Sequence, residues 1–418
     1  MEIQKTILMI PSWYPSKENP FQGSFFKEQA LVLKEKYNFI VCRIIEKHDI
    51  SLIFYIKKLF GQIKPKIKFV NNEENITEYS LVIHIPLYIF LPHIIYELKS
   101  RKGKLRQGIG RIEFPSVQNA RFNNIDILKK KKLLPMFDFV YSLTSQDMVL
   151  LGKAFADVYK KPHITAEHAP FPWPGFTLKN TTIDAIESAD AFLAISSDKV
   201  RQVLLQNIKI SPFYVWNFCD EKQFSLSNKK NDTKTFLIVA ANNFFKNYHL
   251  FIRTMNELKK IANKKFKIII AGYNAVKGYS ENAKELEDMI KKSSFFENTE
   301  MIESVPREKI NLLYNRSDAF VMTSIQEGLP VSAIEASMSG LPVFSTRCGG
   351  VEDYIDDSLG KIVSITDYKG LAEACNDFLN GKKKYDSKHI REKAISLFGR
   401  EAFIKNMSEA FDSVLQDK

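Results

Sequence analysis

Short apolar runs alternate along the chain with longer amphipathic stretches. The apolar runs have the length of buried strands, and the amphipathic stretches have the length of helices. The expected strands are Ile7–Ile10, Phe39–Ile45, Phe139–Ser142, His163–Ala166, Ala191–Ile195, Phe213–Trp216, Thr235–Ala240, Lys267–Ala271, Ala319–Thr323 and Leu341–Ser345. The expected helices include Phe25–Lys36, Gln146–Tyr159, Asp198–Gln206, Tyr248–Ala262, Glu281–Lys292, Arg307–Asn315 and Val331–Ser339. Apolar strands that alternate with helices predict an α/β protein with parallel sheets covered on both faces.

The length of the chain predicts more than one domain. It has 418 residues, whereas a single hydrophobic core stops growing at about 250–300 residues. The polar stretch Ser225–Lys234 separates one strand–helix series from the next, near the middle of the chain. We therefore expect two doubly wound, Rossmann-like domains, at 1–222 and 223–395. Ligands of such sheets bind outside the carboxyl ends of the strands, which places the expected site in a cleft that the two domains face.

Composition is that of a folded protein in a reducing compartment. Hydrophobic residues make up 45% of the chain and charged residues 26%, which excludes a disordered protein. The four cysteines, Cys42, Cys219, Cys348 and Cys375, form no Cys-x-x-Cys pair, so a disulfide framework and a zinc ribbon are excluded. The first residues do not fit a secretory signal, and the longest apolar run, Val82–Tyr96, is too short and too interrupted to span a bilayer. We expect a cytoplasmic protein.

Positive charge is concentrated in one segment. The chain has a formal net charge of +12, and eleven basic residues fall between Leu98 and Lys132, against only two acidic ones. Such a run is either a solvated surface or a surface for a polyanion. It follows the apolar stretch Pro86–Tyr96, and apolar anchors beside basic residues are typical of a segment on an anionic membrane. We favour peripheral association with the inner face of the cell membrane. Nucleic acid is not an expected partner, because aromatic residues are few in the run and no reader motif is present.

The segment Ala319–Tyr354 carries the clearest sign of chemistry. An expected strand ends at Thr323, a loop follows, and Pro330 precedes a helix, so backbone N–H groups at the helix start could bind a phosphate. Glu327 in the loop and Glu335 on the helix are suited to accept hydrogen bonds from sugar and ribose hydroxyls, respectively. Taken as isolated glutamates, they could equally be a helix cap and a surface residue.

The order of residues in this segment removes much of that ambiguity. The run S-x-x-E-G-L-P-x-x-x-x-E-A-x-x-x-G-x-P-V-x-x-T-x-x-G-G-x-E resembles the Glu-x7-Glu signature of the family 4 glycosyltransferases, which are retaining enzymes of the GT-B fold. Pro11–Leu33, Ala189–Ser196 and Val215–Phe224 are also similar to segments of that family. The resemblance implies a donor-binding second domain, an acceptor-binding first domain with a variable region at Phe54–Lys132, and a C-terminal helix at 396–418 that packs back toward the first domain.

The resemblance also implies roles for particular residues. Glu327 and His168 would be catalytic, with His168 beside the donor sugar and Glu167 as a second choice at that place. The nucleotide-sugar donor, most often a UDP-sugar, would be bound by Gly23, Lys246, Ile302, Gly328, Leu329, Val331 and Glu335. Gly23 and Lys246 would approach the diphosphate, and backbone groups at Ile302 would hold the base. The chain departs from the family at Ala241, where many members have an arginine for phosphate, and at Glu303, where a glycine is common.

Other chemistries lack their motifs. The sequence contains no Asp-x-Asp, no His-x-x-His and no cysteine-rich set, so we expect no metal and no cofactor beyond the nucleotide-sugar co-substrate. The absence of a Walker A loop and of Gly-x-Gly-x-x-Gly disfavours ATP and nicotinamide chemistry. The expected activity is transfer of a sugar to a lipid-linked or surface-polysaccharide precursor. A sugar-nucleotide 2-epimerase of the same fold and a catalytically silent glycan- or membrane-binding relative remain as alternatives.

Overall fold

The computed structural model describes residues 4–16, 23–49, 64–73, 75–86, 115–172, 176–226, 233–274 and 280–416. The chain divides into two compact units. Unit one comprises residues 1–194, 200–214 and 406–418, and unit two comprises residues 195–199 and 215–405. Both units are discontinuous in the sequence, whereas the predicted domains are continuous segments.

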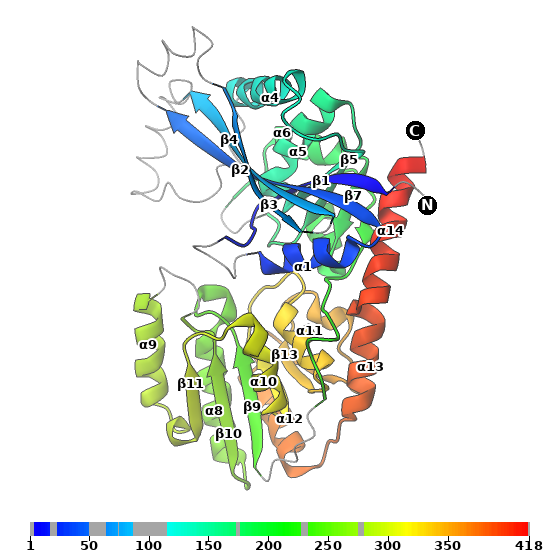
Figure 1. The fold of residues 1–418 in the computed structure, drawn as a ribbon. Helices are drawn as coiled ribbons and strands as arrows, with labels where there is room; N and C mark the ends of the chain where they lie inside the picture. Colours follow the sequence, from blue (N-terminus) through cyan, green and yellow to red (C-terminus); the bar gives the residue numbers. More distant parts are fainter. Residues whose placement is uncertain are drawn as a thin grey trace. The chain divides into compact units, whose positions relative to one another are not determined.

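Unit one is built on a mostly parallel sheet (Figure 1). Its described strands are β1 (Lys5–Pro11), β2 (Tyr37–Asp49), β3 (Lys66–Glu73), β4 (Ile76–Pro86), β5 (Phe139–Leu143), β6 (His163–Glu167), β7 (Ala191–Ala194) and β8 (Phe213–Tyr214). They lie in the order β3-β4-β2-β1-β5-β6-β7-β8. Pairing runs outward in both directions from β1 and β5, so the strand order reverses between these two strands.

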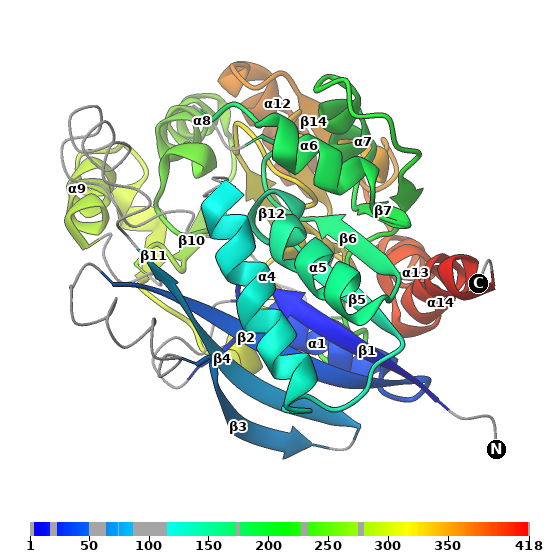
Figure 2. The ribbon, with the colours of Figure 1, turned by 90° about the horizontal axis from the view of Figure 1, so that it is seen from above.

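Helices cover both faces of this sheet. Figure 2 shows α4 (Pro115–Lys130), α5 (Ser145–Tyr159) and α6 (Asn180–Glu187) side by side over one face. Helix α1 (Ser24–Leu33) lies on the other face, and α7 (Ser197–Leu204) follows β7. Buried side chains of β1, β2 and β4 pack against α4 and α5 in one apolar core. The apolar face of each element is thus explained by the layer that it contacts.

Unit two repeats this architecture with a fully parallel sheet. Its described strands are β9 (Lys234–Val239), β10 (Phe266–Ala271), β11 (Thr299–Ile302), β12 (Ala319–Met322), β13 (Val343–Thr346) and β14 (Gly360–Val363), in the order β11-β10-β9-β12-β13-β14. One core joins the sheet to α8 (Tyr248–Ile261), α9 (Ser280–Lys291) and α12 (Tyr368–Asn380). A second core joins the opposite face to α10 (Ile310–Asn315), α11 (Val331–Met338) and α13 (Ser387–Phe398).

The last helix, α14 (Arg400–Gln416), is divided between the two units. Within unit two, Phe403 packs on Phe218, with ring centroids 5.4 Å apart. Within unit one, the ring of Phe411 contacts Tyr37, Phe139 and Tyr141 at 5.0–5.4 Å. The C-terminal turns of this helix therefore complete the core of the unit in which the chain begins.

The predicted pair of doubly wound α/β domains is confirmed, with one departure from parallel pairing. Strand β3 runs antiparallel to β4 at the edge of the sheet of unit one. Its side chains are almost all exposed, so it lacks the apolar run by which a buried parallel strand is recognised. A strand at a sheet edge needs no apolar faces on both sides, and the sequence pattern does not reveal it.

Two close contacts fix how helices pack on the sheet of unit one. Arg121 of α4 is fully buried, and its guanidinium donates two hydrogen bonds, of 2.7 and 3.1 Å, to the carboxylate of Glu46 on β2. On α5, a Cβ atom at Gly152 would lie 2.3 Å from the ring of His163, so only glycine permits this approach. Burial lowers the pKa of His163 to about 3, although Asp190 nearby acts in the opposite sense.

Some sequence expectations lie partly or wholly outside the described residues. The first part of the basic segment, 98–114, lies outside the described residues, and its second part, 115–132, is described. Much of the variable region Phe54–Lys132 is likewise outside. Within the described ranges, no helix is long and apolar enough to cross a membrane.

Candidate functional site

The predicted donor-site residues of unit two gather where the strand order of its sheet reverses. Strands β10 and β11 extend from one side of β9, and β12 to β14 from the other, so the reversal lies between β9 and β12. Doubly wound sheets bind ligands at the carboxyl ends of the strands at this point. The loops that follow β9 and β12 are joined here, because Ile325 N donates to Phe245 O at 2.7 Å and Thr323 Oγ1 donates to Lys246 O at 3.1 Å.

Lys246 and Glu327 form an ion pair at this junction. Lys246 ends a short 3-10 turn, η3 (Phe244–Lys246), whose first amides are capped by the side chain of Asn243. Its Nζ lies 2.6 Å from Oε1 of Glu327. The Oγ of Ser324 also donates to that oxygen, at 2.6 Å. Among the described residues, Oε2 of Glu327 accepts no hydrogen bond. Oε1 is therefore held by Lys246 and Ser324, while Oε2 can accept a hydrogen bond from a ligand.

The backbone around Glu327 is held as tightly as its side chain. Glu327 N donates to Cys348 O at 2.6 Å, which ties the loop after β12 to the loop after β13. A Cβ atom at Gly350, where φ is +68°, would lie 2.1 Å from Gly328 O. This close approach requires glycine at position 350. Burial, together with Glu327, raises the pKa of the Cys348 thiol well above its usual value, so this cysteine is no nucleophile.

The other predicted donor residues of this loop are largely enclosed. Gly328 and Leu329 are buried, and Leu329 O accepts a hydrogen bond of 3.1 Å from Nδ2 of Asn217. Val331 begins α11, and its N-cap residue, Pro330, supplies no side-chain cap to the first amides of the helix. The start of α11 therefore keeps backbone donors that could bind an anion.

Glu335 lies one helical turn further along α11 and is 3% exposed. Its carboxylate is paired with the guanidinium of Arg307 and accepts a hydrogen bond of 2.8 Å from the hydroxyl of Tyr314. Burial and the neighbouring Glu335 raise the pKa of Tyr314, so this hydroxyl stays protonated and donates. Arg307 and Tyr314 were not among the predicted site residues. They reach Glu335 from separate helices, and residues on separate helices have no fixed spacing in the sequence.

Ile302 ends β11 on the other side of the sheet. Its carbonyl accepts a hydrogen bond of 2.9 Å from Gly272 N, and the carbonyl of Glu303 accepts one of the same length from Asn274 N. The backbone at the predicted base-binding position is thus fixed by the loop that follows β10.

Gly23 and His168 belong to unit one, where both lie at the first turn of α1. Gly23 is the N-cap of α1, with φ +70°, and a Cβ atom there would lie 2.5 Å from the backbone of Trp13. The turn needs glycine for that reason alone. His168 follows β6, and its ring packs edge-on against Phe26 of α1 with centroids 4.9 Å apart. The predicted site thus falls into two groups, this pair in unit one and the remaining residues in unit two.

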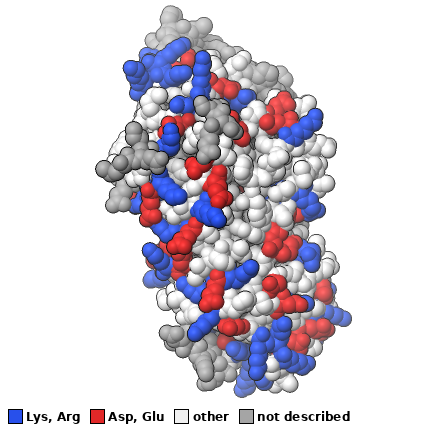
Figure 3. All heavy atoms as spheres, turned by 90° about the vertical axis from the view of Figure 1, so that its right-hand side faces the viewer, with Lys and Arg blue, Asp and Glu red and all other residues white. Residues whose placement is uncertain are grey.

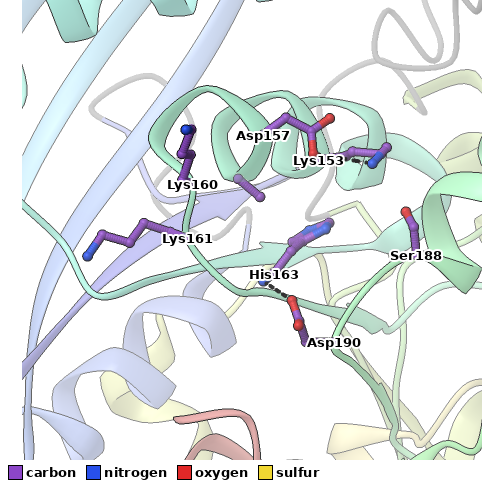
Figure 4. Close-up of a pocket in the computed structure, with 8 residues that line it drawn as sticks. Lys153, Asp157, Lys160, Lys161, His163, Ser188 and Asp190 are labelled. Carbon is purple, nitrogen blue, oxygen red and sulfur yellow. Dashed lines mark hydrogen bonds and ion pairs between the residues drawn. The ribbon is translucent and has the colours of Figure 1, made fainter. Parts of the chain in front are cut away.

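A hollow of about 440 Å³ opens elsewhere in unit one, at the amino-terminal end of β6 (Figure 4). Its lining consists of Lys153, Ala156, Asp157, Lys160, Lys161, His163, Ser188 and Asp190. Helices α5 and α6 both end here, and lysines at helix C-termini offset the negative end of the helix dipole. None of the predicted site residues lines this hollow, and we assign it no role in the chemistry.

Comparison with known proteins identifies the part of the chain that carries the Lys246–Glu327 pair. The family model for glycosyl transferases group 1 matches residues 220–395. These residues lie within unit two. The pairing of Lys246 with Glu327 and that of Arg307 with Glu335 both lie within the matched residues. Among the described residues, no three His, Cys, Asp or Glu side chains are grouped so as to hold a metal ion.

Curated relatives extend the similarity to parts of whole proteins. The chain is 27% identical to the O-antigen chain mannosyltransferase RfbU of Salmonella typhimurium over 193 residues, which cover 44% of this chain and 51% of that protein. It is 31% identical to the amylovoran biosynthesis glycosyltransferase AmsD of Erwinia amylovora over 150 residues, which cover 35% and 39%, respectively. The matches thus span about half or less of the length of these relatives.

Similar solved structures show the fold of the chain, which is that of the GT-B glycosyltransferases. The lipopolysaccharide outer core galactosyltransferase WaaB superposes with a TM-score of 0.64 at 17% identity, covering 98% of this chain and 99% of that one. HepE of Anabaena, in complex with UDP and glucose, superposes with a TM-score of 0.66 at 14% identity, covering 98% and 100%. The fold predicted from the sequence is confirmed. Membership of family 4, and the site roles that it implies, stay predictions.

Proposed function

We propose that the protein is a retaining glycosyltransferase that needs no metal ion. It transfers a sugar from a nucleotide diphosphate, most often UDP, to a hydroxyl of a lipid-linked or surface-polysaccharide precursor. The match of residues 220–395 to the group 1 model supports this proposal, and so do relatives named for O-antigen and amylovoran synthesis. The observation that carries it is the Lys246–Glu327 pair at the strand reversal of unit two, with Oε2 of Glu327 left to accept from a ligand.

The residues of this site suit a transfer on one face of the sugar. The bond between the anomeric carbon and the diphosphate oxygen breaks, and a bond from the acceptor oxygen to that carbon forms on the same face. The acceptor proton passes to the departing phosphate oxygen. Glu327 stabilises the positive charge that develops on the sugar, while Lys246 and the amides at the start of α11 stabilise the leaving diphosphate. His168 holds the donor sugar, and Glu335 holds the ribose.

Titration of nucleotides tests the donor site before any acceptor is known. We expect one of UDP, GDP and ADP to bind at micromolar concentration, equally with and without Mg²⁺. Replacing Glu335 with alanine should weaken that binding, because the ribose would lose its acceptor. If none of the three nucleotides binds the purified protein, the alternative of a catalytically silent relative takes precedence.

Glu327→Ala tests the chemistry. Sugar transfer should fall by about two to three orders of magnitude, the usual loss when a group that stabilises transition-state charge is removed. Nucleotide binding and thermal unfolding should change little. The control is Glu257→Ala, which removes a carboxylate from an exposed ion pair of 3.2 Å with Lys260 in the same unit. Transfer by Glu327→Ala at the wild-type rate would exclude Glu327 from the mechanism, and consumption of donor without acceptor would instead favour the epimerase.

The end of α4 supports the proposed association with an anionic membrane. Lysine and arginine side chains gather at more than one place on the face drawn in Figure 3, so charge alone does not select a surface. Beside the lysines at 129–132, however, Leu133 and Met136 are 37% and 75% exposed. The proximity of Lys64 lowers the pKa of Lys131, which shows that positive side chains crowd here. Basic residues around exposed apolar side chains are the chemistry of an anionic lipid surface.

A further inference from the structure

Glu167 has a fully enclosed carboxylate at the carboxyl end of β6. The residue is 0% exposed. Its Oε2 accepts hydrogen bonds from Ser145 Oγ at 2.7 Å and from Gln146 N at 3.1 Å, both at the start of α5. Its Oε1 accepts from Ala169 N at 2.8 Å. One carboxylate thus ties the first turn of α5 to the residue that follows His168.

The rest of the loop after His168 is fixed in the same way. Pro170 O accepts a hydrogen bond of 2.7 Å from Nε2 of Gln146, and Phe171 N donates one of 2.9 Å to Oε1 of Gln202. Gln146 is 4% exposed and Gln202 7% exposed. Buried polar side chains with their hydrogen bonds satisfied hold a loop in a single conformation. A loop restrained at three successive residues presents its first side chain, His168, in a defined direction.

The enclosure of Glu167 decides between two roles for it. A side chain with no exposed surface cannot touch a substrate, and Glu167 is 0% exposed with its donors in its own unit. Glu335, by contrast, keeps an exposed fraction of 3%. His168 is half-buried and lies against Phe26 of α1. We propose that Glu167 is a positioning residue, which sets the place of His168 through the amide of Ala169 and the start of α5. This inference rests on the proposed function, because the role of His168 does.

Glu167→Gln tests the proposal with little change in shape. The glutamine amide keeps one oxygen that accepts, but its NH₂ group would face an N–H or O–H group that donates to Glu167 in the wild type. The backbone amide of Ala169 should exchange with solvent about ten- to hundredfold faster, as expected when a charge-assisted hydrogen bond is lost. In protein with labelled histidine, the His168 ring resonance should shift away from its position beside Phe26. This resonance is assigned to His168 because it is absent from the spectrum of His168→Gln.

Kinetic measurements test the same proposal in a second way. Hydrolysis of the bound nucleotide-sugar, in which water takes the place of the acceptor and the nucleotide diphosphate leaves, should slow by about ten- to hundredfold in Glu167→Gln, the cost of a misplaced group in a preorganised site. In a protein that already carries His168→Ala, adding Glu167→Gln should cost nothing further, because both changes then act on the same side chain. Full additivity of the two losses would overturn the proposal.

A matched control separates positioning from general stability. Asp138→Asn makes the same acid-to-amide change at a carboxylate of unit one that accepts from Thr6 N at 2.8 Å, at the other ends of the strands. This variant should leave the His168 resonance and the Ala169 amide unchanged. If Glu167→Gln does not fold, Gln202→Leu removes the acceptor of Phe171 N and should shift the His168 resonance in the same direction. An unmoved resonance in the folded variants refutes the proposal, even if the wild type transfers no sugar.

Discussion

At the scale of single residues, several buried polar side chains of unit one are held in place by specific hydrogen bonds. Glu46 with Arg121, and Glu167 with its three donors, are charged groups fully compensated inside the protein. His163 is a different case, because it is buried in its neutral form. Its Nε2 lies 2.8 Å from Ser142 Oγ, and its ring fills the space that Gly152 leaves on α5.

The low pKa of His163, about 3, makes the stability of unit one depend on pH. The folded state resists protonation of this ring, whereas the unfolded chain takes up a proton near pH 6.5. The contribution of neutral His163 to the free energy of unfolding is therefore complete above about pH 6.5 and is lost as the pH falls toward 3. Well below pH 6.5 the loss approaches about 1.4 kcal/mol per pH unit.

Thermal unfolding between pH 7.5 and 4.5 checks this expectation. His163→Gln, whose amide can donate to Ser142 or accept from it, should lose less stability than the wild type as the pH falls. His249→Gln on the exposed side of α8 should follow the wild-type curve. Parallel curves for all three proteins would assign the acid sensitivity to other groups.

At the scale of elements, the loops after β12 and β13 form one unit of structure. Gly350→Ala should destabilise the protein and weaken nucleotide binding by about tenfold or more, because the new Cβ would displace the backbone of Gly328 and Leu329, two of the proposed donor-binding residues. Gly381 provides the matched control: its φ is +76°, yet nothing lies within 4 Å of a Cβ placed there. Gly381→Ala should cost only the backbone strain, about 1 kcal/mol, and leave binding intact. Equal effects of the two changes, in unfolding and in nucleotide titration, would mean that the close contact has no functional consequence.

The elements that the sequence predicts best are those whose side chains are buried on both sides. Strands β9, β10, β12 and β13 read as continuous apolar runs, and the structure has them at nearly the predicted residues. The edge strands β3, β11 and β14 were not predicted, because half or more of the residues in each are exposed or half-buried. The edge strand β8 was predicted, whereas the inner strand β4 was not. A strand at an edge is defined by its partner, and a partner distant in sequence leaves no local pattern.

The site shows the same division. Glu327, Gly328 and Lys246 are marked by a run of residues in fixed order, and the structure brings Lys246 to Glu327. Arg307 and Tyr314 reach Glu335 from η5 (Arg307–Lys309) and α10, and only the packing of these elements on α11 reveals the contact. The enclosure of Glu167 is similarly a property of the fold, since Ser145 and Gln146, which donate to Oε2 of its carboxylate, come from α5.

At the scale of the whole molecule, the lysines at the end of α4 differ in what they can offer a membrane. Lys129 donates to Val158 O at 2.5 Å, and Lys130 pairs with Asp126 at 2.6 Å. Lys131, Lys132 and Lys64 form no ion pair with any described residue, so changing these three to glutamine should weaken binding to vesicles that contain phosphatidylglycerol. Binding should also weaken with added salt, because exposed charges are screened.

Sedimentation with vesicles measures this binding. The control replaces Lys284, Lys291 and Lys292, on α9 and directly after it in unit two, with glutamine, which removes the same charge from another surface. Vesicles of phosphatidylcholine alone should bind neither protein well. If the change at α4 and the change at α9 reduce binding equally, net charge rather than this surface is responsible.

The division of α14 between the units has a consequence for the order in which the chain is made. A ribosome delivers β1 to β8 of unit one first, yet Phe411, which packs on Tyr37, Phe139 and Tyr141, emerges only after nearly all of unit two. At about 5–20 residues per second, the first sheet waits for tens of seconds with one patch of its core uncovered. During that interval the uncovered apolar surface of the nascent chain can aggregate or bind chaperones. A chain released before residue 406 would lack the part of α14 that covers this patch of the core of unit one.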